Sequence, residues 1–120
     1  DVSRRRVETY SGGMKRRLNL AVALLHEPSV LLLDEPAEGV DPQSRILLYD
    51  ALEALAREGR TLILTTHRLE EAERLGRSIV VLDRGRVVAS GPRETLLDGP
   101  DGVRSLETRF FELTGRGLRD

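Results

Sequence analysis

The sequence predicts an α/β fold, in which a mainly parallel sheet is flanked by helices and closed by a terminal β-hairpin. Two apolar runs, at residues 30–33 and 61–65, have the length and composition of buried strands. Segments whose apolar residues recur at helical spacing lie before, between and after these runs. Strands that alternate with helices favour a right-handed βαβ layout. The 120 residues are enough for one modest domain or for a piece of a larger one.

Composition excludes several functional classes. Charged residues make up 32% and hydrophobic residues 39% of the sequence, a balance typical of globular domains, and the net charge of −1 gives no reason to expect nucleic-acid binding. Cysteine is absent, which excludes disulfides and thiolate metal sites, and two histidines are too few for a histidine-rich centre. Since no apolar run approaches the roughly 20 residues that span a bilayer, and no secretion signal is present, we expect a soluble, intracellular chain.

The first predicted elements are a helix and a strand. Apolar residues recur at helical spacing from Met14 to Leu25, with Ser11 as a candidate N-cap. The continuous apolar run that follows ends at Asp34, Glu35 and Pro36. A strand that is apolar on both faces is typical of a central parallel strand, so we expect helices to cover both of its sides.

The next helix has signals at both of its ends. Asp41 and Pro42 have the residue types of an N-cap and a first helical residue, and Gly59 is a plausible stop. The second apolar run, 61–65, then predicts a strand that leads into Thr66 and His67. The apolar face of the helix between the strands comprises Leu48, Ala51, Leu52 and Leu55.

The rest of the chain predicts shorter elements. A charged helix is expected over 69–75 and a strand over 78–82, which the turn at 83–86 joins to an antiparallel partner at 87–89. Near the C-terminus, Leu106, Phe110 and Leu113 lie at helical spacing and predict a terminal helix before Gly115.

We therefore expect an α/β part over 1–97, a linker over 98–103, and a C-terminal helix and tail over 104–120.

Three groups of residues have types suited to phosphate chemistry. Asp34 and Glu35 end a strand, where functional groups gather in α/β sheets, and paired acids there can hold magnesium and a water molecule. The segment Ser11–Gly13 at a predicted helix start offers backbone amides to an anion. His67 follows the second strand and can donate a hydrogen bond to phosphate. Taken singly, these groups are more often a strand-to-loop junction, a glycine-rich cap and a surface histidine.

Their combination resembles the ABC ATPase family. Tyr10-Ser11-Gly12-Gly13-Met14 is similar to the signature motif, and Val30 to Glu35 resembles the Walker B strand with its following acid. Gly39-Val40-Asp41-Pro42 is similar to the D-loop, and Thr66-His67 to the switch histidine. The four motifs occur in the order and at the spacing of the family, over residues 8 to 97. The implied fold is the C-terminal half of a P-loop NTPase-like, three-layer domain.

The resemblance also implies roles for single residues. Asp34 would bind Mg²⁺, mostly through water, and Glu35 would act as general base on the attacking water. His67 would contact the γ-phosphate of ATP. Asp41 would organise a dimer interface. The signature residues Tyr10, Ser11, Gly12, Gly13 and Met14 would bind a nucleotide held mainly by the opposite subunit.

Three departures from the family pattern refine this picture. The sequence contains no G-x-x-x-x-G-K-[ST] loop, so the main phosphate cradle is missing and the chain alone is expected to be inactive. Met14, where glutamine is usual, together with Tyr10 resembles exporter-type ATPases. Glu38 replaces a small or amide residue near the expected dimer interface.

The sequence thus favours an ATP-hydrolysing subunit of an ABC-type membrane exporter, with ATP and Mg²⁺ as ligands. Its expected partners are a second ATPase subunit, arranged head to tail, and a transmembrane permease, and its expected location is the cytoplasmic face of the membrane. Two alternatives remain: a soluble ABC ATPase of translation or DNA maintenance, and a non-catalytic interaction fragment.

Overall fold

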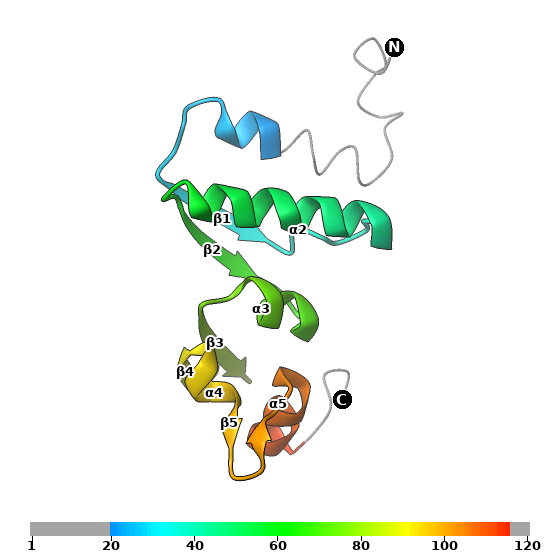
Figure 1. Ribbon diagram of the computed structural model, residues 1–120, viewed down its shortest axis with the longest axis vertical. Coiled ribbons are helices and arrows are strands. Elements are labelled where there is room, and N and C mark those ends of the chain that lie inside the picture. The colour runs from blue at the N-terminus through cyan, green and yellow to red at the C-terminus, as the bar shows by residue number, and fades with distance from the viewer. Residues whose placement is uncertain (1–19, 116–120) are drawn as a thin grey trace. The chain divides into compact units, whose positions relative to one another are not determined.

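The structure, a computed structural model, describes residues 20–115 of the chain (Figure 1). It divides into two compact units between Thr65 and Thr66.

The first unit is built on a βαβ crossover. Strand β1 (Val30–Asp34) pairs in parallel with β2 (Thr61–Thr65), and α2 (Pro42–Arg57) connects them (Figure 1). Residues 20–24, which precede β1, are helical. The Arg60 guanidinium donates to the Pro28 carbonyl at 2.6 Å and ties together the segments that enter the two strands. Both strands and the helix between them were predicted, and the structure confirms them.

The ends of α2 follow from its sequence. Asp41 has extended backbone angles, and its Oδ2 accepts a hydrogen bond from the Ser44 N–H at 3.2 Å, which satisfies one of the unpaired amides of the first turn. Pro42 supplies the first turn with a fixed φ and needs no acceptor. Gly59, with a φ of 93°, takes the left-handed conformation that ends the helix.

The core of the first unit covers one face of the strands, not two. Leu31 is buried with Leu48 and Leu52 of α2, whereas 75% of Leu32 is exposed. Side chains alternate between the faces of a strand, so the outer face carries Leu32 with its register partner Ile63, which is 52% exposed. Within residues 20–65 the second, outer face of the strands is exposed, so the expected cover on both faces stays a prediction.

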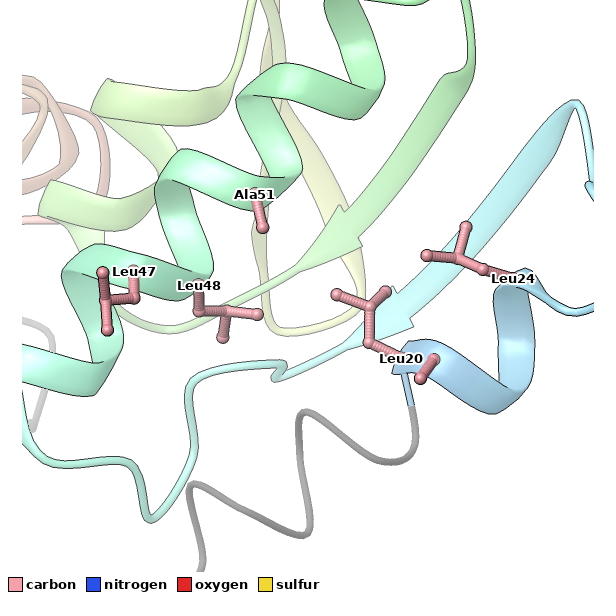
Figure 2. Close-up of a pocket in the computed structure, with 6 residues that line it drawn as sticks. Leu20, Leu24, Leu47, Leu48 and Ala51 are labelled. Carbon is pink, nitrogen blue, oxygen red and sulfur yellow. The ribbon is translucent and has the colours of Figure 1, made fainter.

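An open apolar groove of about 220 Å³ lies in the same unit, between the helical residues 20–24 and α2 (Figure 2). Its lining is entirely aliphatic and offers no charged group to a phosphate, so it is not the nucleotide site that the sequence suggests. The lining residues are Leu20, Ala21, Leu24, Leu47, Leu48 and Ala51.

The second unit begins with α3 (Leu69–Leu75), followed by an antiparallel hairpin of β3 (Ser78–Asp83) and β4 (Arg86–Pro92). The hairpin turn holds Arg84 and Gly85 at φ values of 51° and 77°, the backbone twist that tight two-residue turns require. The helix and the antiparallel hairpin are confirmed.

The remaining elements are short. Helix α4 (Arg93–Leu97) precedes a small hairpin of β5 (Asp98–Gly99) and β6 (Gly102–Val103), and α5 (Leu106–Thr114) follows. Residues 98–103, expected to form a linker, thus form a two-stranded hairpin, and α4 was not predicted.

A compact core holds the second unit together. The Leu106 amide of α5 donates to Glu73 Oε1 of α3 at 2.8 Å, and Leu69 and Ala72 of α3 pack against the core from their helix. The core residues are Ile79, Val81, Leu96, Leu97 and Leu106. Helices α3 and α5 are therefore fixed to the same apolar cluster.

Among residues 20–115, every helix is too short or too polar to cross a lipid bilayer.

Changing the α2 cap should alter the pH dependence of stability. Hydrogen bonds from Ser44, first from its side chain and then from its amide, lower the pKa of Asp41. A lowered folded-state pKa stabilises the fold above the unfolded pKa of about 3.9, and this contribution disappears as pH falls through the folded value. We expect Asp41→Asn to keep the cap but lose this pH dependence, and Asp41→Ala to lose the cap as well. Thermal unfolding between pH 2 and 7 measures both effects; a parent and an Asp41→Asn variant with parallel profiles would contradict the assignment.

Candidate functional site

The first unit brings together the carboxyl ends of its two strands. In the parallel register, Asp34 is the partner of Thr65, so β1 and β2 end at the same level. The carboxyl ends of parallel strands are where α/β proteins bind ligands, because the following loops diverge there and expose backbone and side-chain groups. This edge is therefore the candidate site of the unit.

Asp34 is exposed at this edge, and its carboxylate has a neighbour that was not predicted. The Thr65 hydroxyl donates to Asp34 Oδ1 at 2.5 Å. The bond orients the carboxylate and occupies one lone pair of one oxygen. Magnesium keeps several of its waters and needs only one or two carboxylates, so an exposed, oriented carboxylate fits a hydrated Mg²⁺.

Glu35 has an unusual backbone conformation. Its φ is 48°, in the left-handed region that non-glycine residues rarely adopt. Its amide donates to the Thr65 carbonyl at 2.9 Å, and its own carbonyl accepts from the Glu38 amide at 3.1 Å. The turn breaks the alternation of the strand, so Asp34 and Glu35 do not simply alternate across one sheet. Strain of this kind is often found at functional sites.

The loop from Glu35 to Asp41 is anchored to the core of the unit. Ala37 and Val40 are 1% and 6% exposed, and the Val40 amide donates to the Ala37 carbonyl at 3.1 Å. Gly39, at a φ of 75°, makes the tight turn between them. The acid pair and the Asp41 cap thus stand at opposite ends of one well-packed loop.

His67 lies in the second unit, two residues beyond the end of β2, and is exposed. Its neighbours in the chain are hydrogen-bonded: the Arg68 amide donates to Thr66 Oγ1 at 2.9 Å, and the Thr66 hydroxyl donates to Glu71 of α3. The structure thus places His67 in a loop that is bound on both sides.

The signature residues Tyr10, Ser11, Gly12, Gly13 and Met14 lie outside the described residues. Their proposed contacts with nucleotide therefore stay predictions.

Comparison with known proteins identifies the family. Residues 4–73 match the family described as "AAA domain, putative AbiEii toxin, Type IV TA system". The chain belongs to this AAA-domain family.

Curated relatives of this AAA-family chain share a name. Over 102 residues, or 85% of the chain, it is 48% identical to "Nod factor export ATP-binding protein I" of Rhizobium meliloti, of which it covers 30%. It is 45% identical over 114 residues to the protein of that name from Cupriavidus metallidurans, covering 95% of this chain and 37% of the relative. The Burkholderia thailandensis protein is 48% identical over 102 residues, 85% of this chain and 34% of its own length.

The chain thus spans about a third of the length of these relatives. The predicted resemblance to ATP-binding subunits of exporters is confirmed, as is the coarse α/β class with a parallel strand pair.

Sequence reasoning did not predict the hydrogen bonds of Thr65, Thr66 and Glu71 in this AAA-family chain. The Thr65 hydroxyl donates to Asp34. The Thr66 hydroxyl donates to Glu71 and accepts the amide of Arg68, the residue after His67. The parallel alignment of 30–34 with 61–65 was available from the sequence and identifies Thr65 as the neighbour of Asp34. No comparable sequence pattern distinguishes Glu71 from the other acids of α3.

The backbone of Glu35 gives a direct test of strain. We expect Glu35→Gly to be at least as stable as the parent, because glycine adopts a φ of 48° without a Cβ clash. Glu35→Val should be less stable than Glu35→Gly by about 1–3 kcal/mol, because a β-branched residue is a genuine outlier there.

Chemical denaturation of the two variants measures the difference. The matched control is the same pair of substitutions at Glu58, whose φ is −75°. Equal stability of the two Glu35 variants would contradict the left-handed turn.

Proposed function

We propose that this chain is the C-terminal part of the ATP-binding, ATP-hydrolysing subunit of an ABC-type membrane exporter. The observation that carries the proposal is the Asp34–Glu35 pair at the shared carboxyl edge of two parallel strands, with the Thr65 hydroxyl on Asp34. The names of the relatives, which describe export and ATP binding, support the same function.

Asp34 is proposed to hold Mg²⁺, mostly through water. The exposed carboxylate suits this role, because the bond from Thr65 orients it and leaves it open to solvent. When bound with ATP, the ion supplies charge stabilisation to the transferring phosphoryl group.

Glu35 is proposed as the general base that polarises the attacking water. Its left-handed backbone turn separates its direction from that of Asp34, so the two adjacent carboxylates can serve different partners. The bonds from its amide to Thr65 and from Glu38 to its carbonyl hold the turn in place. A base must be positioned before its basicity can matter.

The other roles rest on the resemblance to the family. His67 is proposed to contact the γ-phosphate and link it to the attacking water. Ser11, Gly12 and Gly13, flanked by Tyr10 and Met14, are proposed to bind the γ-phosphate of a nucleotide held by the opposite subunit. Asp41, which caps α2, is proposed to organise the dimer interface as well.

The complete subunit is proposed to act in a larger assembly. Another part of the protein is proposed to supply the lysine-containing phosphate loop and to complete a three-layer domain. The outer face of β1 and β2, which carries Leu32 and Ile63, supports such a completion. The proposed partners are a second ATPase subunit, arranged head to tail, and a permease, with the ATPase on the cytoplasmic face of the membrane. ATP-driven dimerisation would couple to transport.

In the complete subunit, we expect Glu35→Gln to preserve ATP binding and to lower hydrolysis by roughly 10²- to 10⁴-fold, the usual contribution of a general base. Because hydrolysis releases the two subunits, the variant should accumulate as an ATP-bound dimer. Phosphate release and size-exclusion chromatography with ATP measure the two effects.

A variant that stays monomeric with ATP would argue against the proposal. The isolated 120-residue chain is the matched control, because it lacks the phosphate loop and is expected to release no phosphate in steady state. Sustained turnover by this chain that depends on Glu35 would contradict the account.

A further inference from the structure

We infer that Thr66 and Glu71 are positioning residues for His67, and that they hold the loop in which His67 acts on the γ-phosphate. The inference deepens the proposed function and rests on it. It is carried by the hydrogen bonds around His67 and by the burial of Glu71.

Glu71 buries a carboxylate, and burying a carboxylate costs free energy of folding. It is 0% exposed, and its Oε1 finds no hydrogen-bond partner among residues 20–115. Burying a polar group with an unpaired acceptor destabilises a fold, and an apolar residue of similar volume is often neutral or stabilising at such a place. The carboxylate therefore contributes little to stability and calls for another role.

The only bond that the described residues show to this carboxylate comes from Thr66, whose hydroxyl donates to Glu71 Oε2. The same hydroxyl oxygen accepts the Arg68 amide at 2.9 Å. A hydroxyl has one proton. The Thr66 oxygen accepts the Arg68 amide, so the hydroxyl proton of Thr66 is free to point at the Glu71 carboxylate. Glu71 therefore fixes the rotamer in which Thr66 accepts the Arg68 amide.

These bonds enclose His67. Thr66 precedes it and Arg68 follows it, so the backbone is bound immediately before and immediately after the histidine. A threonine that accepts the amide two residues later forms a compact turn. The turn limits the conformations of the His67 backbone while leaving its exposed side chain outside the hydrogen-bonded ring.

Helix α3 provides a rigid base for this turn. Glu73 Oε1 accepts the Leu106 amide at 2.8 Å, and the Arg93 guanidinium donates to the Glu73 carbonyl at 2.8 Å. Leu69 and Ala72 pack against the core of the unit. Helix α3 is therefore fixed to the core, and its Glu71 holds Thr66. Thr66 in turn holds the backbone next to His67.

The experiment compares matched variants of the complete subunit. Thr66→Val removes the hydroxyl at nearly the same volume, whereas Thr66→Ser keeps it. Glu71→Leu removes the acceptor, whereas Glu71→Gln keeps an oxygen that can accept. If positioning is lost, kcat for ATP hydrolysis should fall about 10- to 100-fold in Thr66→Val and Glu71→Leu, with KM for ATP within about twofold. Thr66→Ser and Glu71→Gln should restore most of kcat.

A double-mutant cycle with His67→Ala separates positioning from a general structural role. In the His67→Ala background, Thr66→Val should lower kcat no further, because the residue that it positions is gone. A merely structural effect would add to that of His67→Ala. Glu70→Gln, at an exposed neighbour on α3, is the control for changes in the helix and should leave kcat unchanged.

The outcomes separate the proposed role of His67 from the positioning role of Thr66 and Glu71. If His67→Ala leaves hydrolysis unchanged, the role of His67 in the proposed function fails. If His67→Ala lowers kcat but Thr66→Val has no effect, or an additive one, the inference is overturned while the proposed function stands. Should Thr66→Val unfold the subunit, Glu71→Gln and Glu71→Leu carry the test: equal activity of this pair overturns the inference.

Discussion

The parallel pairing of β1 with β2 is the interaction on which the candidate site depends. The register sets Asp34 beside Thr65, so that a hydroxyl orients the carboxylate and the Thr65 carbonyl receives the amide of Glu35. A shift of one residue would turn every side chain of a strand to the opposite face, burying Leu32 in place of Leu31. The register that pairs the two strands therefore also places the acids.

Two features that cost stability come after the carboxyl ends of β1 and β2. Glu35 adopts a left-handed φ directly after β1, and Glu71 buries a carboxylate shortly after β2. The Asp41 cap and the hairpin turn at Arg84 and Gly85, by contrast, follow local sequence preferences. Natural proteins break local rules mainly where function requires it, which is why these two residues are assigned to the proposed chemistry.

Most helices and strands of the fold could be predicted, because the local sequence signals agree with the observed structure. The runs 30–34 and 61–65, the Asp41–Pro42 start and the 83–86 turn each carry their own cue. The exposure of Leu32 could not be predicted, because an apolar residue does not show whether a partner surface covers it. The α4 helix and the 98–103 hairpin are too short for periodicity. Glu71 escaped notice since burial of one acid in a charged helix depends on its three-dimensional neighbours.

The most direct test is the Mg²⁺ dependence of ATP hydrolysis in the complete subunit, with Asp34→Asn against the parent. If the carboxylate that Thr65 orients holds the hydrated ion, Asp34→Asn should need a higher Mg²⁺ concentration for half-maximal hydrolysis. Asp50→Asn, at an exposed acid on α2, should leave the curve unchanged. Identical Mg²⁺ curves for Asp34→Asn and the parent would contradict the account.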